Sequence, residues 1–462
     1  MPGTDLLDPL PLLRTEDTSE AFTQRLLVQV LEPAGRAWWS LFLISTAGTV
    51  MYAVAMVWIF VVGIGALGNN IPNAWAFPII NFVWWIGFGH AGTLISAILV
   101  LFQQKWRASI NRFAETMTLC AVTQAGIYPI LHLGRPEYAF WLLPYPTTLS
   151  VWPQFRSALT WDAGAVATYL LVSLIFWYVG LIPDLAAARD RVRTSRGRIF
   201  YACASLGWRG SARAWEHWRT GYLLLAALAT ALVISVESII SMDFATSQLP
   251  GWHSNIFPPY YVASAMFGGF ALLLVILIPV REVYRLTGVI TEKHIDLVNR
   301  MVLLFSWFVT YGYLQENLMA WLGGDPFEIR TFADLWGGHY AGWWWATVAG
   351  TSLIPQLMWS SRLRRSRLAS VLVGLAVVVG VWLEQFTHII PSLSHAFIPS
   401  MWRNYRPSPV DFMILFGSIS FFGWLYLVLA KIVPLVPASD VKKLHQELSL
   451  PPKRAAAPAE GG

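Results

Sequence analysis

Charged residues are scarce in this sequence. Only 13% of its 462 residues are Asp, Glu, Lys or Arg, whereas soluble globular proteins contain about 25%. This composition excludes a disordered chain and argues against a soluble enzyme. The excess of Lys and Arg gives a net charge of +6, and its placement in loops on one side, described below, argues against a nucleic acid partner.

Cysteine is rarer still. The two cysteines, Cys120 and Cys203, are too few for an iron–sulfur cluster, which needs about four thiolates. We expect isolated reduced thiols and no metal site. The N-terminus also lacks the basic start and short apolar core of a secretory signal, so the first apolar run is expected to direct membrane insertion.

Long apolar runs dominate instead. Hydrophobic residues make up 56% of the chain, and a membrane-spanning helix needs about 20 mostly apolar residues. Ten runs meet this requirement: Trp38–Leu67, Ala76–Phe102, Phe113–Leu133, Ala163–Ile182, Gly221–Met242, Pro259–Val280, Met301–Leu322, Ala341–Met358, Leu368–Ile390 and Phe412–Val433. The sequence therefore predicts an all-α integral membrane protein with about ten transmembrane helices and no separate soluble domain.

The distribution of Lys and Arg predicts the orientation. If the N-terminus lies in the cytoplasm, 27 of the 32 basic residues lie in cytoplasmic segments, as the positive-inside rule requires. The other five face outward: Arg135, Arg156, Arg330, Arg403 and Arg406. Both end segments, 1–37 and 434–462, are then cytoplasmic tails, and the count of helices is even.

A weak internal repeat suggests how the helices are grouped. The third and seventh runs are each preceded by or begin near Asn-Arg (Asn111-Arg112 and Asn299-Arg300), and the fourth and eighth contain or end near Ile-Pro (Ile182-Pro183 and Ile354-Pro355). This pattern predicts two four-helix bundles of the same orientation, over 76–242 and 259–390, flanked by helices 38–67 and 412–433. Chance matching of two dipeptides is the alternative.

Ionisable residues within the apolar runs are the candidate site, because each costs at least about 2.5 kcal/mol in a bilayer. The outer half holds most of them. His132 and Asp162 flank the aromatic loop Arg135–Trp161, and an imidazole with a carboxylate could take two protons from a hydroquinone. The alternative is that both are interfacial, with Asp162 as the N-cap of the fourth helix.

Other polar residues have competing interpretations. Gln124, Tyr128 and His132 share a helical stripe, which more often forms an interhelical hydrogen-bond seam than a polar lining. His90 could be a haem ligand, a proton carrier or a satisfied contact, but counting residues from the helix ends gives it no histidine partner at its depth; His132 with His388 remains geometrically open. For Glu115, an ion pair with Arg112 is favoured over a proton path.

The remaining acids are candidates for a proton path. No Lys or Arg lies at the depth of Glu237, Glu316 or Glu384, so each should be protonated, paired with a histidine or amide, or facing water. Asp243 and His388 lie at the outer ends of their helices, where Asp243 could be merely interfacial.

Two stretches resemble a known family. They are WWIGFGHAGTLISAILVLFQQKWRASINRFAETMT (84–118) and YPILHLGRPEYAFWLLPYP (128–146). They resemble the NrfD/PsrC family of quinone-interacting membrane subunits, and within it the ActC-type subunit of bacterial alternative complex III. The resemblance extends from the first to the tenth predicted helix and is densest in helices two to four.

The resemblance implies a function. It implies paired four-helix bundles that carry no haem or iron–sulfur cluster and oxidise a quinol (menaquinol or ubiquinol) near the outer face of a bacterial cytoplasmic membrane. His132 and Asp162 would bind the quinol head, and Tyr128, Arg135 and Trp141 would shape the pocket. Electrons would pass to a periplasmic iron–sulfur subunit and to cytochrome c subunits, beside a paralogous membrane subunit, and protons would be released outward. Whether protons are also pumped through the deeper residues stays open.

Two alternatives from other classes stay open at this point. Buried acids and a repeat would also suit a secondary transporter, although transporter sites usually lie near the midplane. A purely structural membrane anchor without a quinol site would show the same helices. The residues leave the direction of electron flow and the final acceptor undecided.

Overall fold

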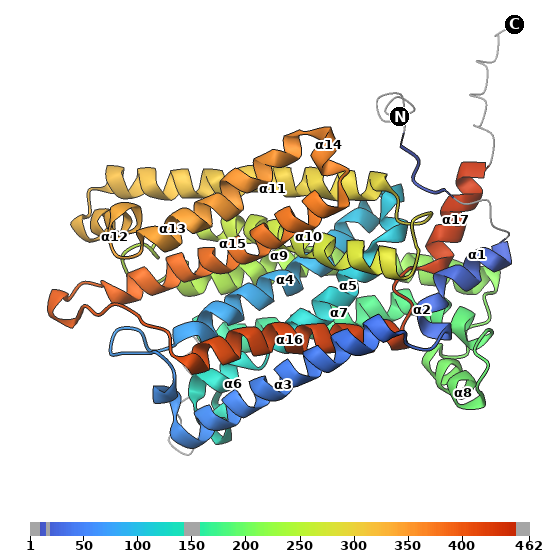
Figure 1. The fold of residues 1–462 in the computed structure, drawn as a ribbon, viewed down its shortest axis with the longest axis horizontal. Coiled ribbons are helices and arrows are strands. Elements are labelled where there is room, and N and C mark those ends of the chain that lie inside the picture. The colour runs from blue at the N-terminus through green and yellow to red at the C-terminus, as the bar shows by residue number, and fades with distance from the viewer. Residues whose placement is uncertain (1–9, 15–18, 143–157, 450–462) are drawn as a thin grey trace, which may run out of the picture.

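The computed structural model describes residues 10–14, 19–142 and 158–449. Within them, all regular secondary structure is helical. The long helices lie side by side along the long axis of the molecule (Figure 1). This arrangement is the one that a bilayer permits, because a helix satisfies its own backbone hydrogen bonds.

Eight of the described helices are long and apolar enough to cross a membrane. Each of them overlaps one of the ten apolar runs that the sequence predicts to span the membrane. They are α3 (Arg36–Val62), α4 (Ala76–Leu101), α7 (Ala158–Arg189), α9 (Ala212–Ala245), α10 (Phe257–Val283), α11 (Glu292–Gly323), α15 (Arg367–Ser394) and α16 (Pro409–Ile432). The chain is therefore a multi-pass membrane protein, as predicted.

The other two predicted spans are interrupted rather than continuous. The third divides into α5 (Asn111–Ala125) and α6 (Tyr128–Leu133), because Pro129 near the start of α6 has no N–H to continue the helical ladder. The eighth begins as α13 (Ala341–Val348), widens into a π-helical turn over 349–353 and tightens into a 3₁₀ helix over 354–359, where Pro355 again removes a donor.

The shorter helices lie at the two ends of the molecule. They are α1 (Ser19–Leu26), α2 (Val28–Leu31), α8 (Ser195–Ala204), α12 (Pro326–Gly337), α14 (Ser361–Arg364) and α17 (Ala438–Ser449). The described parts of the two predicted tails are thus partly helical, and α1 packs against α17. Their buried side chains include Phe22, Leu26, Val441 and Leu444.

The helices pack as two groups of four. Helices α4, α5, α7 and α9 contact one another, and so do α10, α11, α13 and α15. The interface between the groups is made mainly by α4 and α10, while α3 pairs with α16 beside the first group. The groups coincide with the two bundles that the weak repeat predicts.

The interior of the protein is centred on α4 and α10. In the apolar window of α4, 89% of residues are buried within the protein, against 17% for α3, which therefore exposes its apolar side chains to lipid. Small residues explain the close packing of α4. A Cβ on Gly92 would lie 2.3 Å from the carbonyl oxygen of Ala114 on α5, and one on Gly269 of α10 would lie 2.1 Å from the Cβ of Ala91.

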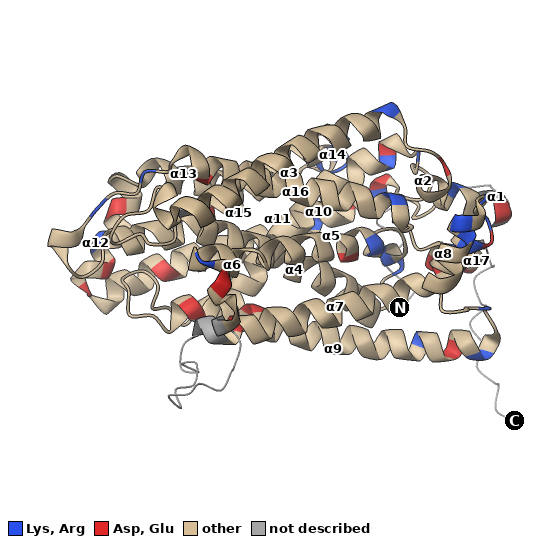
Figure 2. Ribbon diagram, turned by 90° about the horizontal axis from the view of Figure 1, so that it is seen from below, with Lys and Arg blue, Asp and Glu red and all other residues tan. Residues whose placement is uncertain are grey.

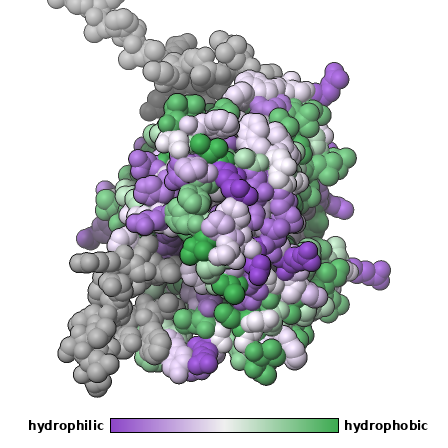
Figure 3. All heavy atoms as spheres, turned by 90° about the vertical axis from the view of Figure 1, so that its left-hand side faces the viewer, coloured by the Kyte–Doolittle hydropathy of each residue, from purple (hydrophilic) through white to green (hydrophobic). Residues whose placement is uncertain are grey.

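The two ends of the molecule differ in charge. Lys and Arg gather at the end that carries α1, α8 and α17 (Figure 2). The opposite end, near α6 and α12, presents hydrophilic side chains mixed with apolar ones, with apolar residues along the sides (Figure 3). The basic end is the one that the sequence predicts to face the cytoplasm, and we call it the inner end; the opposite one is the outer end.

Candidate functional site

Asp162 is buried near the outer end of the first bundle. Helix α7 begins at Ala158, so Asp162 lies one turn inside the helix, and the expectation that it caps the helix is wrong. Its side chain is 5% exposed. Its carboxyl group lies close to that of Asp243 in the last turns of α9. Two adjacent carboxylates repel each other unless one holds a proton, so this pair is a candidate proton-binding site.

His132 lies in the last turn of α6, which ends at Gly134 in a left-handed conformation (φ +63°). Its imidazole hydrogen-bonds to the backbone carbonyl of Pro78 on α4. The Nε2 atom is buried and has no hydrogen-bond partner among the described residues, which leave out 143–157. The Pro78 carbonyl can only accept, so Nδ1 is the donor, and in a neutral imidazole Nε2 then has a free lone pair. This nitrogen can accept a proton from a bound hydroxyl group.

Among the described residues, no hydrogen bond joins His132 to Asp162. The carboxyl group of Asp162 lies close to that of Asp243, and the imidazole of His132 bonds to the carbonyl of Pro78. The connecting segment 143–157 lies outside the described residues, and so does the side chain of Trp141. Arg135 is exposed at the start of that connection. The joint role of His132 and Asp162 therefore stays a prediction.

Tyr128 and Gln124 face α3 and α16. The amide Nε2 of Gln124 donates to the hydroxyl of Tyr52 on α3 over 2.7 Å. Tyr128 is fully buried, with its hydroxyl among Tyr52, Gln124 and Ser418. Gln124, in the polar stripe of the third span, thus forms an interhelical hydrogen bond, as the sequence favours. In the same stripe, His132 keeps one ring nitrogen without a partner among the described residues.

His90 pairs with Glu237 deeper in the first bundle. Its Nδ1 is in close contact with the Oε2 of Glu237 on α9, and both side chains are at most 3% exposed. The ring of Tyr169 on α7 lies edge-on to the imidazole, with centroids 4.4 Å apart. A satisfied polar contact was one of the three interpretations of His90, and its partner is a carboxylate of α9.

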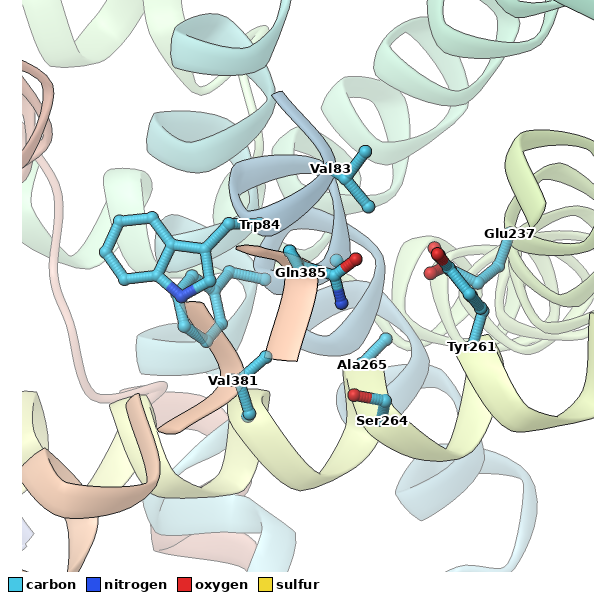
Figure 4. A pocket seen from close by; sticks show the side chains of 11 residues that line it. Val83, Trp84, Glu237, Tyr261, Ser264, Ala265, Val381 and Gln385 are labelled. Carbon is cyan, nitrogen blue, oxygen red and sulfur yellow. The ribbon is translucent and has the colours of Figure 1, made fainter. Parts of the chain in front are cut away.

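A small cavity lies where the two bundles meet. The volume within which the centre of a water molecule can lie is about 10 Å³. This is close to the volume that one ordered water needs. Glu237 and Tyr261 lie side by side on one wall, and the amide of Gln385 is directed inward (Figure 4). Ser264 lies one turn from Tyr261 on α10 and also lines the cavity. The cavity thus borders a carboxylate of the first bundle and a hydroxyl of the second.

The second bundle holds its own cluster of buried polar groups. The hydroxyl of Ser264 donates to Glu384 over 3.0 Å, and the hydroxyl of Tyr260 donates to the same carboxylate. One helical turn further along α15, the Nε2 of His388 is 3.3 Å from Glu316 of α11. Pairing with a histidine is one of the states predicted for these acids, and the contacts confirm it for Glu237 and Glu316. Glu384 instead accepts from hydroxyl groups, a pairing that we did not predict.

The two bundles repeat the same connection. In each, a glutamate on the fourth helix bonds to a side chain on the first: Glu237 to His90, and Glu384 to Tyr260 and Ser264. His132 and His388 belong to different bundles and have separate protein partners, Pro78 and Glu316. This arrangement does not favour the haem that a His132–His388 pair could have held.

Glu115 belongs to a buried ion pair nearer the inner end. Arg112 contacts Glu115 at 2.7 Å and Asp184 of α7 at 3.3 Å. Ser96 and Tyr222 also donate to Glu115, over 2.6 and 2.8 Å. The predicted ion pair is confirmed. Arg300, the counterpart of Arg112 in the repeat, is instead 43% exposed beside Asp296, so the sequence repeat does not extend to this network.

Sequence reasoning missed the uncharged members of these clusters. Tyr169, Tyr260, Tyr261 and Ser264 are all buried and line or complete the polar sites. Neutral hydroxyl groups cost less to bury than charges, so a search for ionisable residues in apolar runs passes over them. Among the described residues, no group of three His, Cys, Asp or Glu side chains is placed to hold a metal ion.

The fold and the site define a class of protein: a multi-pass membrane protein of two four-helix bundles with paired acids and histidines between its helices. The sequence model of the family described as "Polysulphide reductase, NrfD" matches residues 65–396. The chain therefore belongs to the NrfD family. The matched region covers both bundles. The flanking helices α3 and α16 lie outside it.

Two relatives are similar over most of their length. A putative dimethyl sulfoxide reductase membrane subunit of Halobacterium salinarum is 25% identical over 329 residues, or 70% of each chain. A selenate reductase subunit of Mesobacillus selenatarsenatis is 23% identical over 399 residues, which cover 81% of this chain and 88% of that protein. Neither belongs by name to alternative complex III, so that narrower resemblance stays a prediction.

Proposed function

We propose that this chain is the membrane subunit of an oxidoreductase complex and that it oxidises a quinol at its outer end. The observation that carries the proposal is the buried Nε2 of His132, which has no partner within the described part of the chain. It lies at the same end of the first bundle as the Asp162–Asp243 pair. Membership of the NrfD family and two relatives that are subunits of reductases support it.

Quinol oxidation releases two protons and two electrons, and the site offers two separate proton acceptors. One quinol hydroxyl would give its proton to Nε2 of His132. The other would give its proton to the carboxyl pair of Asp162 and Asp243, which can hold a second proton once the first is shared. The two electrons would pass to an iron–sulfur partner subunit that docks on the outer end of this chain.

The finer features of the proposal follow from orientation. With the basic end inside a bacterial cytoplasmic membrane, both released protons would leave on the periplasmic side. We further propose an alternative complex III type of assembly with cytochrome c subunits and a paralogous membrane subunit. Pumping would additionally need a route through groups such as Glu237 and His90, and quinol oxidation does not depend on it.

The proposal predicts that the whole complex loses quinol oxidation when either acceptor is removed. In the purified native complex, His132→Ala and Asp162→Ala should each lower the rate with menaquinol and ubiquinol analogues by about 10²-fold or more, the usual contribution of a general base. His253→Ala is the control, because His253 is exposed and bonds only to the backbone of Ser247. Native electrophoresis checks that the whole complex is still assembled.

Unchanged activity in both variants would contradict the proposal and favour a structural anchor. A transporter is distinguished separately: substrate uptake by vesicles that lack any electron donor would favour it, and we expect none.

A further inference from the structure

A large groove lies at the inner end of the protein, far from the proposed quinol site. It has about 1110 Å³ open to water-sized molecules. Its walls come from the inner end of α4 and the 3₁₀ helix Lys105–Ser109, from the first turns of α9, and from α17. The charged first turns of α9 are followed by apolar residues from Gly221 onward, and the orientation predicted from Lys and Arg places this end at the cytoplasmic membrane surface.

The groove is cationic. Its basic and acidic lining residues are Lys105, Arg107, Arg219, Lys442 and Lys443, and Glu216, Asp440 and Glu447. Two of the acids are already held, Asp440 by Arg107 at 2.9 Å and Glu447 by Lys443 at 3.7 Å. Among the described residues, Lys105, Arg219 and Lys442 have no ion-pair partner, and only Glu216 remains to balance them.

Lys442 is only partly compensated by an anion. Partial burial and the nearby Arg191 lower the pKa of its ammonium group, and Glu20 only partly offsets them. An anion in the groove would favour the charged lysine.

The opposite wall is apolar and aromatic. The indole of Trp218 stacks on the ring of Tyr222 with centroids 5.2 Å apart, and Trp215 packs edge-on against Trp218. Leu223, one turn deeper, is 44% exposed. Cations at the rim above an apolar wall match a molecule with an anionic head and acyl chains, since Trp favours the interface and Lys and Arg attract anionic headgroups.

We propose that this groove binds the headgroup of an anionic phospholipid, with its acyl chains against Trp218 and Leu223. The apolar wall argues against a soluble protein or a free inorganic anion as the ligand, because neither carries acyl chains that would pack against it. Lys442 lies on α17, outside residues 65–396 that match the family. The site is therefore assigned to this chain and not to the family as a whole.

The test is lipid binding by the intact, delipidated complex in detergent. Fluorescent phosphatidylglycerol is titrated against fluorescent phosphatidylcholine, for wild type and for Arg219→Gln with Lys442→Gln. Each cation near a membrane surface contributes roughly fivefold, so the double variant should bind phosphatidylglycerol on the order of 25-fold more weakly, with phosphatidylcholine unchanged. The matched control is Arg196→Gln with Arg198→Gln, which removes the same charge from α8 outside the groove.

Several outcomes would overturn the proposal. They are an equal loss in the control, no loss in the groove variant, or displacement of the lipid by millimolar inorganic phosphate, which would indicate a simple anion site. A protein subunit that cross-links at Lys105 in the native complex and excludes the lipid would also overturn it. If the double variant assembles poorly, Lys105→Gln alone, at an exposed position, should still weaken binding about fivefold.

Discussion

The buried glutamates of this protein have specific side-chain partners. Glu237 and His90 are almost completely buried and contact each other across α9 and α4. A buried polar group that loses its partner bears the full cost of desolvation, roughly 1–3 kcal/mol. Each of these pairs therefore acts as a unit, and its two members should not contribute independently.

A double-mutant cycle on His90 and Glu237 tests this coupling. His90→Ala and Glu237→Ala should each lower the free energy of unfolding by roughly 1–3 kcal/mol. The double variant should lose less than the sum, with a coupling energy between about 0.5 and 3 kcal/mol. Thermal unfolding of the detergent-solubilised protein, followed by tryptophan fluorescence, gives the values.

The control cycle combines His90→Ala with Glu316→Ala. Glu316 lies in the other bundle, with His388 as its partner, so these two effects should add within about 0.5 kcal/mol. Additive effects for the His90–Glu237 cycle would show that the contact is not maintained in the folded protein.

Helix α4 is the element on which the whole arrangement depends. It contacts α5, α9, α10 and α15, and it provides His90 to one cluster and the carbonyl of Pro78 to His132. Gly89 and Gly92 permit these contacts, because side chains at their positions would collide with Val122 and Ala114 of α5. The Gly-His-Ala-Gly string thus combines a packing role with the placement of a polar residue.

We expect Gly92→Ala to destabilise the protein. The new methyl group would meet the carbonyl oxygen of Ala114 at 2.3 Å, and overpacking of a dense interior typically costs about 1–3 kcal/mol. Gly164→Ala on α7 is the matched control, since an added Cβ there would have no atom within 4 Å. It should leave the unfolding midpoint unchanged or slightly raised, because alanine favours helix.

Equal midpoints for the Gly92 and Gly164 variants would mean that α4 and α5 do not pack closely at Gly92. The same thermal unfolding assay decides the question.

The whole molecule is polarised along its long axis. Basic residues gather at the end with α1, α8 and α17 (Figure 2), and the proposed quinol site lies at the opposite end. Charge asymmetry of this kind sets the orientation of a membrane protein during insertion. In the proposed function, the placement of the loops therefore sets the side of the membrane on which quinol is oxidised.

The two natural cysteines make this orientation testable. Cys203 on α8 is exposed and Cys120 on α5 is buried. A membrane-impermeant maleimide should label Cys203 in inside-out vesicles and not in intact spheroplasts. In a Cys203→Ser background, Ser400→Cys at the exposed outer end should show the reverse pattern. Labelling of Cys203 from outside would invert the orientation and move the proposed site to the cytoplasmic face.

Hydrophobicity and charge alone determined much of the architecture. A bilayer leaves helices as the only structure for long apolar runs, so the helical class and the eight long spans follow from composition. The two interrupted spans were also located, but their breaks at Pro129 and Pro355 were not foreseen. The Arg112–Glu115 pair was foreseen because its members are one helical turn apart.

Only the tertiary structure decided which distant residues meet. Counting along a helix gives depth but not which helices are neighbours, so it could not pair His90 with Glu237, or Asp162 with Asp243. Contacts between helices depend on how small residues let the helices approach and on where each loop ends. Such contacts depend on two helices at once, so they cannot be predicted from one stretch of sequence alone.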